Sequence, residues 1–159
     1  MLMNKIDSIA LVNKTDSAVW VITLTLILLE ALNDLLRREI KILYLIITAG
    51  IGIIALIFSG DKSKIFSSIM GIGIGLLIIV MAYLTQGGIG YGDGLLLCVT
   101  GLLIGLRGNI ILLFMGCFFS AIVSMFLLVI KKADRKTPLP FVPFLIPAVI
   151  TAYIFERII

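Results

Sequence analysis

The sequence predicts an all-α, polytopic membrane protein, a bundle of about six transmembrane helices. Of its 159 residues, 61% are hydrophobic and 14% are charged, whereas soluble domains are about 45–50% apolar and about 25% charged. The mean hydropathy of +1.24 points the same way. Spans of about 20 residues fill this length and leave no room for a separate domain outside the membrane. One membrane domain is therefore expected over 18–159, in contact with the lipid bilayer, after a polar N-terminal segment over 1–17.

The first three spans are apolar runs separated by charged breaks. They are expected at residues 18–36, 40–58 and 65–85, with Arg and Glu residues after the first and a Ser-Gly-Asp-Lys break after the second. Backbone groups in hydrocarbon must be hydrogen-bonded within their own segment, so each run is expected to be a helix. Gly71 and Gly75 lie four residues apart in the third span, and small residues at this spacing let helices approach closely. They predict helix packing rather than a cofactor loop.

The last three spans follow the same logic. The fourth is short, over residues 93–106, and follows the glycine-rich string QGGIGYG. The fifth is expected at 109–130, and a charged stretch at 131–136 separates it from the sixth, at 139–155.

Loop charge predicts the orientation in the membrane. The loops on one side hold seven basic residues: Arg37, Arg38, Lys41, Lys131, Lys132, Arg135 and Lys136. The other loops hold three, Lys62, Lys64 and Arg107, and the two tails on that side add Lys5, Lys14 and Arg157. The loop bias places the first set in the cytoplasm and both termini outside it. Because these basic residues are scattered among short loops, without interleaved aromatics, no nucleic-acid partner is expected.

The residue types that are missing exclude several chemistries. The chain has no histidine, which excludes Ser-His and Cys-His hydrolases and HExxH zinc proteases. Cys98 and Cys117 each lie inside an apolar run without CxxC spacing, so they are expected to be packed thiols rather than metal ligands. No metal and no cofactor is predicted. A Ser-Lys dyad is disfavoured, because Ser120 and Ser124 lie mid-span and Lys131 ends the helix.

Three carboxylates lie within or at the edges of apolar spans: Glu30, Asp34 and Asp93. An ionisable group at membrane depth costs a few kcal/mol and is a functional candidate for that reason. Asp34 is near the end of the first span and Asp93 opens the fourth. The two spans between them each cross once, so both aspartates return to the same face, whichever way the protein is inserted.

Two neighbouring aspartates can hydrolyse an amide without histidine or metal. Like charges a few ångströms apart tend to share one proton. The charged member can then take a proton from water while the protonated member hydrogen-bonds the scissile carbonyl. Gly90 and Gly92 flank Asp93 and would permit a close approach of a substrate backbone. The alternative is a plain interhelical loop in which Asp93 caps a helix.

The string Gly90-Tyr91-Gly92-Asp93 resembles the GxGD signature of membrane aspartic proteases, and its surroundings, GGIGYGDGLLLCVTGLLIG, resemble the prepilin peptidase (type IV leader peptidase) family. The stretch DLLRREI, which begins at Asp34, resembles the first catalytic motif of that family. PFVPFL, from Pro140 to Leu145, resembles its late segment. The resemblance implies a membrane aspartic endopeptidase that cleaves the basic leader from prepilin-like precursors at the cytoplasmic membrane face, with Asp34 and Asp93 as catalytic residues. Residues expected to bind substrate or support the loops are Gly90, Gly92, Glu30, Pro140 and Pro143.

The chain departs from the family pattern at three places. Lys41 stands where the family has proline, Leu95 where lysine is common, and Val142 where the late motif has glycine. The cytoplasmic insert with two CxxC pairs is absent, so a peptidase without N-methyltransferase activity is predicted. Glu30 lies one helical turn before Asp34. It is expected either to be hydrogen-bonded inside the bundle, the favoured interpretation, or to act on Asp34 or the substrate.

Two other functions stay open from the sequence. A proton-coupled transporter subunit could use Glu30, Asp34 and Asp93 as a relay, although its acids should lie nearer the bilayer midplane. A non-catalytic assembly protein could use the same acids to join helices. The substrate (pilin, pseudopilin, competence pilin or archaellin) and the oligomeric state are not fixed by the sequence.

Overall fold

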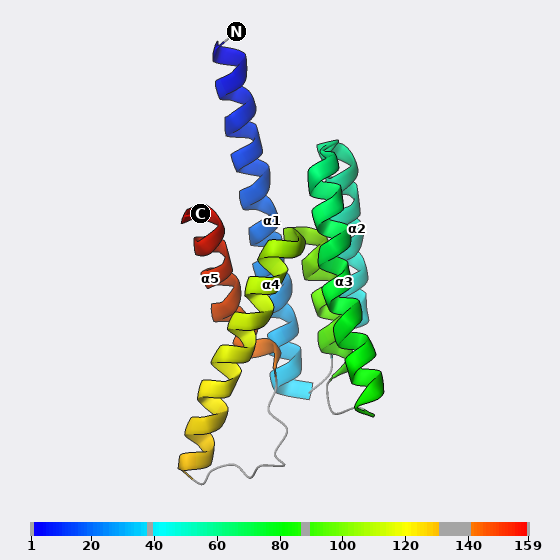
Figure 1. The fold of residues 1–159 in the computed structure, drawn as a ribbon, viewed down its shortest axis with the longest axis vertical. Coiled ribbons are helices and arrows are strands. Elements are labelled where there is room, and N and C mark those ends of the chain that lie inside the picture. The colour runs from blue at the N-terminus through cyan, green and yellow to red at the C-terminus, as the bar shows by residue number, and fades with distance from the viewer. Residues whose placement is uncertain (1, 38–39, 87–89, 131–140, 159) are drawn as a thin grey trace.

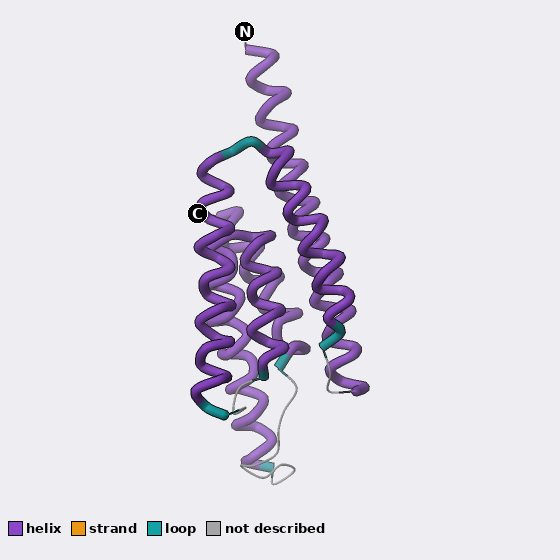
Figure 2. The backbone as a smooth tube through the Cα atoms, turned by 90° about the vertical axis from the view of Figure 1, so that its right-hand side faces the viewer, coloured by secondary structure: helices purple, strands orange, loops and turns teal. Residues whose placement is uncertain are grey.

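The computed structural model describes residues 2–37, 40–86, 90–130 and 141–158, with side chains from residue 17 onward (Figure 1). Its elements in chain order are α1 (Leu2–Arg37), α2 (Ile42–Ser59), α3 (Lys62–Leu84), α4 (Tyr91–Val129), the short 3-10 helix η1 (Val142–Phe144) and α5 (Leu145–Ile158). The described residues contain helices and loops but no strand (Figure 2). The all-helical fold class is confirmed, and α1 carries the polar N-terminal segment as a continuous helical extension of the first span.

Four of these helices are long and apolar enough to cross a membrane. The candidate spans are Ser17–Arg37, Ile42–Ser59, Lys62–Leu84 and Tyr91–Val129. Large apolar side chains point outward along them, and Leu36 and Phe58 are more than 80% exposed. Exposed apolar surface on this scale marks a lipid-facing protein rather than a soluble one. The chain is therefore a multi-pass membrane protein.

The predicted count of six helices is not confirmed, because the described residues hold five α-helices. The fourth and fifth predicted spans form one helix, α4, of 39 residues. A straight helix of that length would measure about 58 Å, against a hydrocarbon core of about 30 Å. In Figure 1, α4 instead rises beside α3, bends at its upper end and descends, so that both of its ends lie in the lower part of the bundle.

The bend in α4 is located at Gly105. This residue has φ 71° and ψ −173°, outside the helical region, and a positive φ of this kind favours glycine. Ser67 of α3 compensates for the broken helical hydrogen bonding, since its Oγ accepts a hydrogen bond from the Leu106 N–H at 3.1 Å. The sequence places the break slightly later, at Arg107, because a charged residue there looks like a loop.

α4 also packs closely on α3 through glycines. A Cβ on Gly71 would lie 2.4 Å from the carbonyl oxygen of Gly101, and one on Gly75 would lie 2.3 Å from the Cys98 nitrogen. The two backbones are therefore in direct contact, as the spacing of small residues predicts. Asn109 is fully buried beside this contact, and its side-chain nitrogen donates to the carbonyl oxygen of Gly71 at 3.0 Å.

α1 packs on the other side of the bundle against η1 and α5. Its buried side chains recur at helical spacing and include Leu26, Ile27 and Ala31. They form a common core with Val142 and Leu145, which are fully buried at the start of the C-terminal helical region. This packing brings the end of α1 and η1 together.

Candidate active site

The structure brings the two predicted catalytic aspartates together. Asp34 lies in the last turn of α1, and Asp93 lies in the first turn of α4. The end of α1 and the start of α4 both lie in the lower part of the bundle in Figure 1. The two carboxyl groups are close enough to interact electrostatically. Two spans, α2 and α3, separate the end of α1 from the start of α4. Because each crosses the membrane once, the chain returns to the same side, as the sequence predicts.

A backbone donor holds Asp34 in place. The N–H of Val142 donates a hydrogen bond to Asp34 Oδ2 at 3.2 Å, across 108 residues of sequence. Val142 is the first residue of η1, and its side chain is fully buried. Hydrogen bonds to a carboxylate are stronger than those between neutral groups. The contact therefore fixes one oxygen of Asp34 against the C-terminal helical region.

The Asp93 carboxyl group lies close to the residue that caps its own helix. Gly90 is the N-cap of α4, and a Cβ built on it would lie 2.8 Å from Asp93 Oδ2. The carboxyl group therefore folds back over the residue that precedes the helix. Glycine at position 90 therefore leaves space for this carboxyl group.

Gly92 makes room for the segment between α1 and α2. A Cβ on Gly92 would lie 2.7 Å from Cδ1 of Ile40 and 3.1 Å from its Cβ, so the Ile40 side chain rests on the backbone next to Asp93. Pro143 lies within η1 beside Val142, one residue from the donor to Asp34. Pro140 lies outside the described residues, as do Gly87 and Gly88 of the loop before α4.

Glu30 is the third carboxyl group of this region. Its side chain is fully buried, and its Oε2 accepts a hydrogen bond from the Lys41 N–H at 3.0 Å. It also lies within electrostatic range of Asp34. This agrees with the expectation of a carboxyl group hydrogen-bonded inside the bundle. Within the described residues, no three His, Cys, Asp or Glu side chains are grouped closely enough to hold a metal ion.

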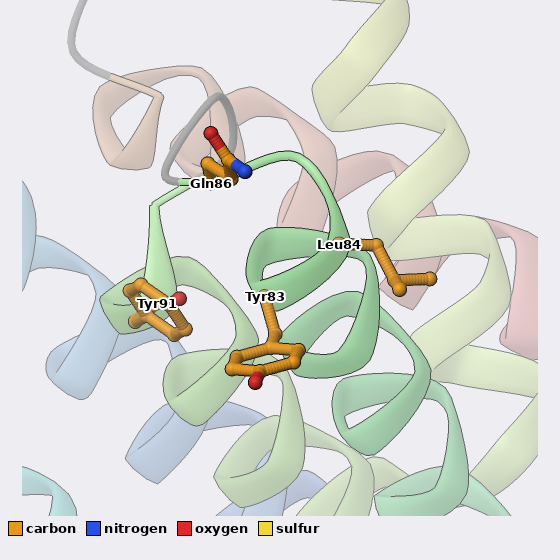
Figure 3. Close-up of a pocket in the computed structure, with 4 residues that line it drawn as sticks. All are labelled: Tyr83, Leu84, Gln86 and Tyr91. Carbon is orange, nitrogen blue, oxygen red and sulfur yellow. The ribbon is translucent and has the colours of Figure 1, made fainter.

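A shallow pocket lies beside the start of α4. It measures about 530 Å³ and is lined by Tyr83, Leu84, Gln86 and Tyr91. Tyr83 comes from the last turn of α3 and Tyr91 is the first residue of α4, and both rings line the same hollow (Figure 3). Tyr91 is two residues before Asp93 in the sequence, so the pocket lies at the start of the helix that carries Asp93.

Two hydrogen-bond donors in this region are backbone N–H groups, which the sequence analysis could not predict. The N–H groups of Val142 and Lys41 bind Asp34 and Glu30. Every residue except proline carries the same donor, so no residue type marks these positions.

Comparison with known proteins identifies the family of this chain. The family model of the type IV leader peptidase family matches residues 20–125, a range that includes both aspartates. The chain is also 26% identical over 140 residues to a prepilin leader peptidase/N-methyltransferase of Bacillus subtilis, which covers 85% of this chain and 54% of the relative. It therefore spans about half the length of that relative. No solved structure gives a significant match. Since the family model covers well over half of its residues, the chain belongs to the type IV leader peptidase family.

Proposed function

We propose that this protein is a membrane aspartic endopeptidase that removes the basic leader from prepilin-like precursors. The observation that carries the proposal is the placement of Asp34 and Asp93 at one end of the bundle (Figure 1), within electrostatic range of each other, on helices far apart in the chain. Family membership supports the peptidase class. The Bacillus subtilis relative is named for prepilin leader cleavage, which supports a prepilin-like substrate here.

The chemistry follows from the pair of carboxyl groups. Two carboxyl groups in close proximity share one proton more readily than both ionise. The ionised member takes a proton from a water molecule, which attacks the scissile carbonyl, and the protonated member donates a hydrogen bond to the carbonyl oxygen. Neither aspartate is assigned to one role, because such a pair titrates as a unit. The substrate must be extended at the cleaved bond, since a helix hides its carbonyl groups.

The surroundings of the aspartates suit a substrate that crosses from water into lipid. Tyr83 and Tyr91 line a pocket at the start of α4, the helix that carries Asp93, and a basic leader residue can lie over one of these rings. The connections at this end of the bundle, α1 to α2 and α4 to η1, carry the larger number of basic residues in the sequence. This bias supports a cytoplasmic site, where the leader of a precursor would also lie.

The test is co-expression with a prepilin-like precursor, with leader loss observed as a gel shift. The wild-type chain should convert the precursor, and the Asp34→Asn/Asp93→Asn double variant should not. The mass of the new N-terminus checks the prediction that it is not methylated. Absence of cleavage by the wild type, together with proton-dependent uptake into vesicles, would favour the transporter function, which family membership does not support.

Replacement of Gly90 by alanine is expected to lower the cleavage rate about 10-fold, because a small displacement of a reacting group is costly. The added methyl group would lie 2.8 Å from Asp93 Oδ2 and must displace it. The φ of Gly90, −67°, suits alanine, so the backbone should not change. Gly50→Ala is the control, since nothing lies within 4 Å of its Cβ position. Equal rates for the two variants would show that the position of the Asp93 carboxyl group near Gly90 is unimportant.

A further inference from the structure

Glu30 makes one hydrogen bond from a fully buried position. Its Oε2 accepts from the Lys41 N–H at 3.0 Å, whereas its Oε1 has no hydrogen-bond partner among the described residues. Burial of a carboxyl group is costly, and most buried polar groups are therefore bonded. Among the described residues, the bond to Lys41 is the hydrogen bond by which this side chain joins two helices.

The bond ties the start of α2 to α1. Lys41 is the N-cap residue of α2, and its own side chain makes no capping hydrogen bond. The hydrogen bond from the Lys41 N–H to Glu30 therefore connects the N-cap of α2 to α1. Without the carboxylate, the Lys41 N–H would lose its partner in this part-buried hydrogen bond, and the contact between α1 and the start of α2 would be lost with it.

Ile40, the residue before Lys41, contacts the glycine that precedes Asp93. The Ile40 side chain packs on Gly92, where an added Cβ would lie 3.1 Å from the Ile40 Cβ. Gly92 directly precedes Asp93. A continuous series of contacts thus runs from Glu30 through the Lys41 backbone and Ile40 to the residue next to Asp93. Glu30 itself lies one turn before Asp34 on α1.

We propose that Glu30 is a positioning residue: its bond to the Lys41 N–H holds Ile40 against Gly92 and thereby sets Asp93 relative to Asp34. This inference rests on the proposed peptidase function for its kinetic consequence. The role requires a hydrogen-bond acceptor at position 30 and no proton transfer. A glutamine at this position supplies an amide oxygen as acceptor, whereas a leucine fills the space without one.

The first test compares Glu30→Gln with Glu30→Leu in leader cleavage. The leucine variant is expected to lower kcat about 10- to 100-fold and to change KM by less than about threefold, because misplacement of a reacting group affects the chemical step. The glutamine variant should stay within about threefold of the wild type, since the acceptor is kept. Thr23→Val is the control, because Thr23 is buried on the same helix and its hydroxyl donates to the Val19 carbonyl oxygen of its own helix. Equal losses in the glutamine and leucine variants would overturn the proposal.

The second test removes the donor. Lys41→Pro deletes the N–H, and the φ of Lys41, −85°, is close to that of proline. It should lower kcat as Glu30→Leu does, while Lys41→Ala, which keeps the N–H, should not. In the Glu30→Leu background, Lys41→Pro should add little further loss, because both changes remove one interaction. Additive losses, or an equal loss for Lys41→Ala, would contradict the proposal.

A third measurement is independent of cleavage. Cysteines at positions 40 and 92, in a Cys98→Ser/Cys117→Ser background, should form a disulfide when isolated membranes are treated with an added oxidant such as copper phenanthroline. The Cβ separation of 3.1 Å lies just below the range for disulfides, about 3.5–4.5 Å, so a small outward shift suffices. Glu30→Leu should lower the yield at least about threefold and Glu30→Gln should not, because the acceptor determines whether the pair stays in this geometry. Equal yields would overturn the positioning role even if the wild type cleaves prepilins. Loss with leucine alone would support that role even if no precursor is cleaved.

Discussion

Asparagine in place of Asp93 is expected to lower leader cleavage by about 1000-fold, and asparagine in place of Asp34 by a similar factor. Asparagine has nearly the size of aspartate and keeps the contact with Gly90, but it cannot take or share a proton. If the two carboxyl groups act as one unit, the double variant should be little worse than either single variant. The measurement is the initial rate of precursor cleavage in membranes that hold equal amounts of each protein.

The matched control is Asp61→Asn. Asp61 caps α3, where its Oδ1 accepts from the Ser63 N–H at 2.9 Å, and asparagine caps a helix about as well as aspartate. The α2–α3 connection lies at the end of the bundle away from the aspartate pair (Figure 1). Cleavage by Asp61→Asn should equal that of the wild type. Substantial cleavage by both the Asp34 and Asp93 variants would exclude the aspartate mechanism.

Leucine in place of Gly71 is expected to lower the free energy of unfolding by about 3 kcal/mol or more, at the upper end of the cost of overpacking. The Cβ alone would lie 2.4 Å from the Gly101 carbonyl oxygen. The obstructing atoms belong to the backbone, so no side chain can rotate away and α3 must separate from α4. The Asn109 hydrogen bond to the Gly71 carbonyl would be lost at the same time. Equilibrium unfolding of the purified protein in mixed detergent micelles measures this change.

Gly73→Leu provides the comparison within the same helix. Nothing lies within 4 Å of a Cβ at Gly73, so its leucine variant should unfold within about 0.5 kcal/mol of the wild type. Both substitutions add the same side chain to α3 and have the same effect on helix propensity. If the two variants were equally unstable, close packing against α4 would not be the reason that Gly71 is needed.

Hydropathy and span parity anticipated the helical class and the convergence of the aspartates, because both depend on local composition and on counting crossings. The count of separate helices failed at Gly105. Hydropathy marks Arg107 and Gly108 as a break, whereas the backbone turns at Gly105 and continues as helix on both sides. A single glycine with positive φ changes the direction of a helix without any polar loop, and composition has no signal for this.

The hydrogen-bond partners of the acids could not be predicted from the sequence. Val142 donates to Asp34 across 108 residues, and Lys41 donates to Glu30 across 11. Both contacts depend on how separate helices approach each other, and both use the main chain, which is the same at nearly every residue. The acidic side chains could be selected from the sequence, whereas their backbone hydrogen-bond donors could be found only in the structure.

The main-chain donor to Asp34 has a consequence for mutagenesis. Alanine scanning changes side chains and leaves the amide of residue 142 in place, so a scan would assign Val142 a packing role and miss its bond to the carboxylate. Proline, or a backbone ester introduced at this position by chemical synthesis, would be needed to remove the donor.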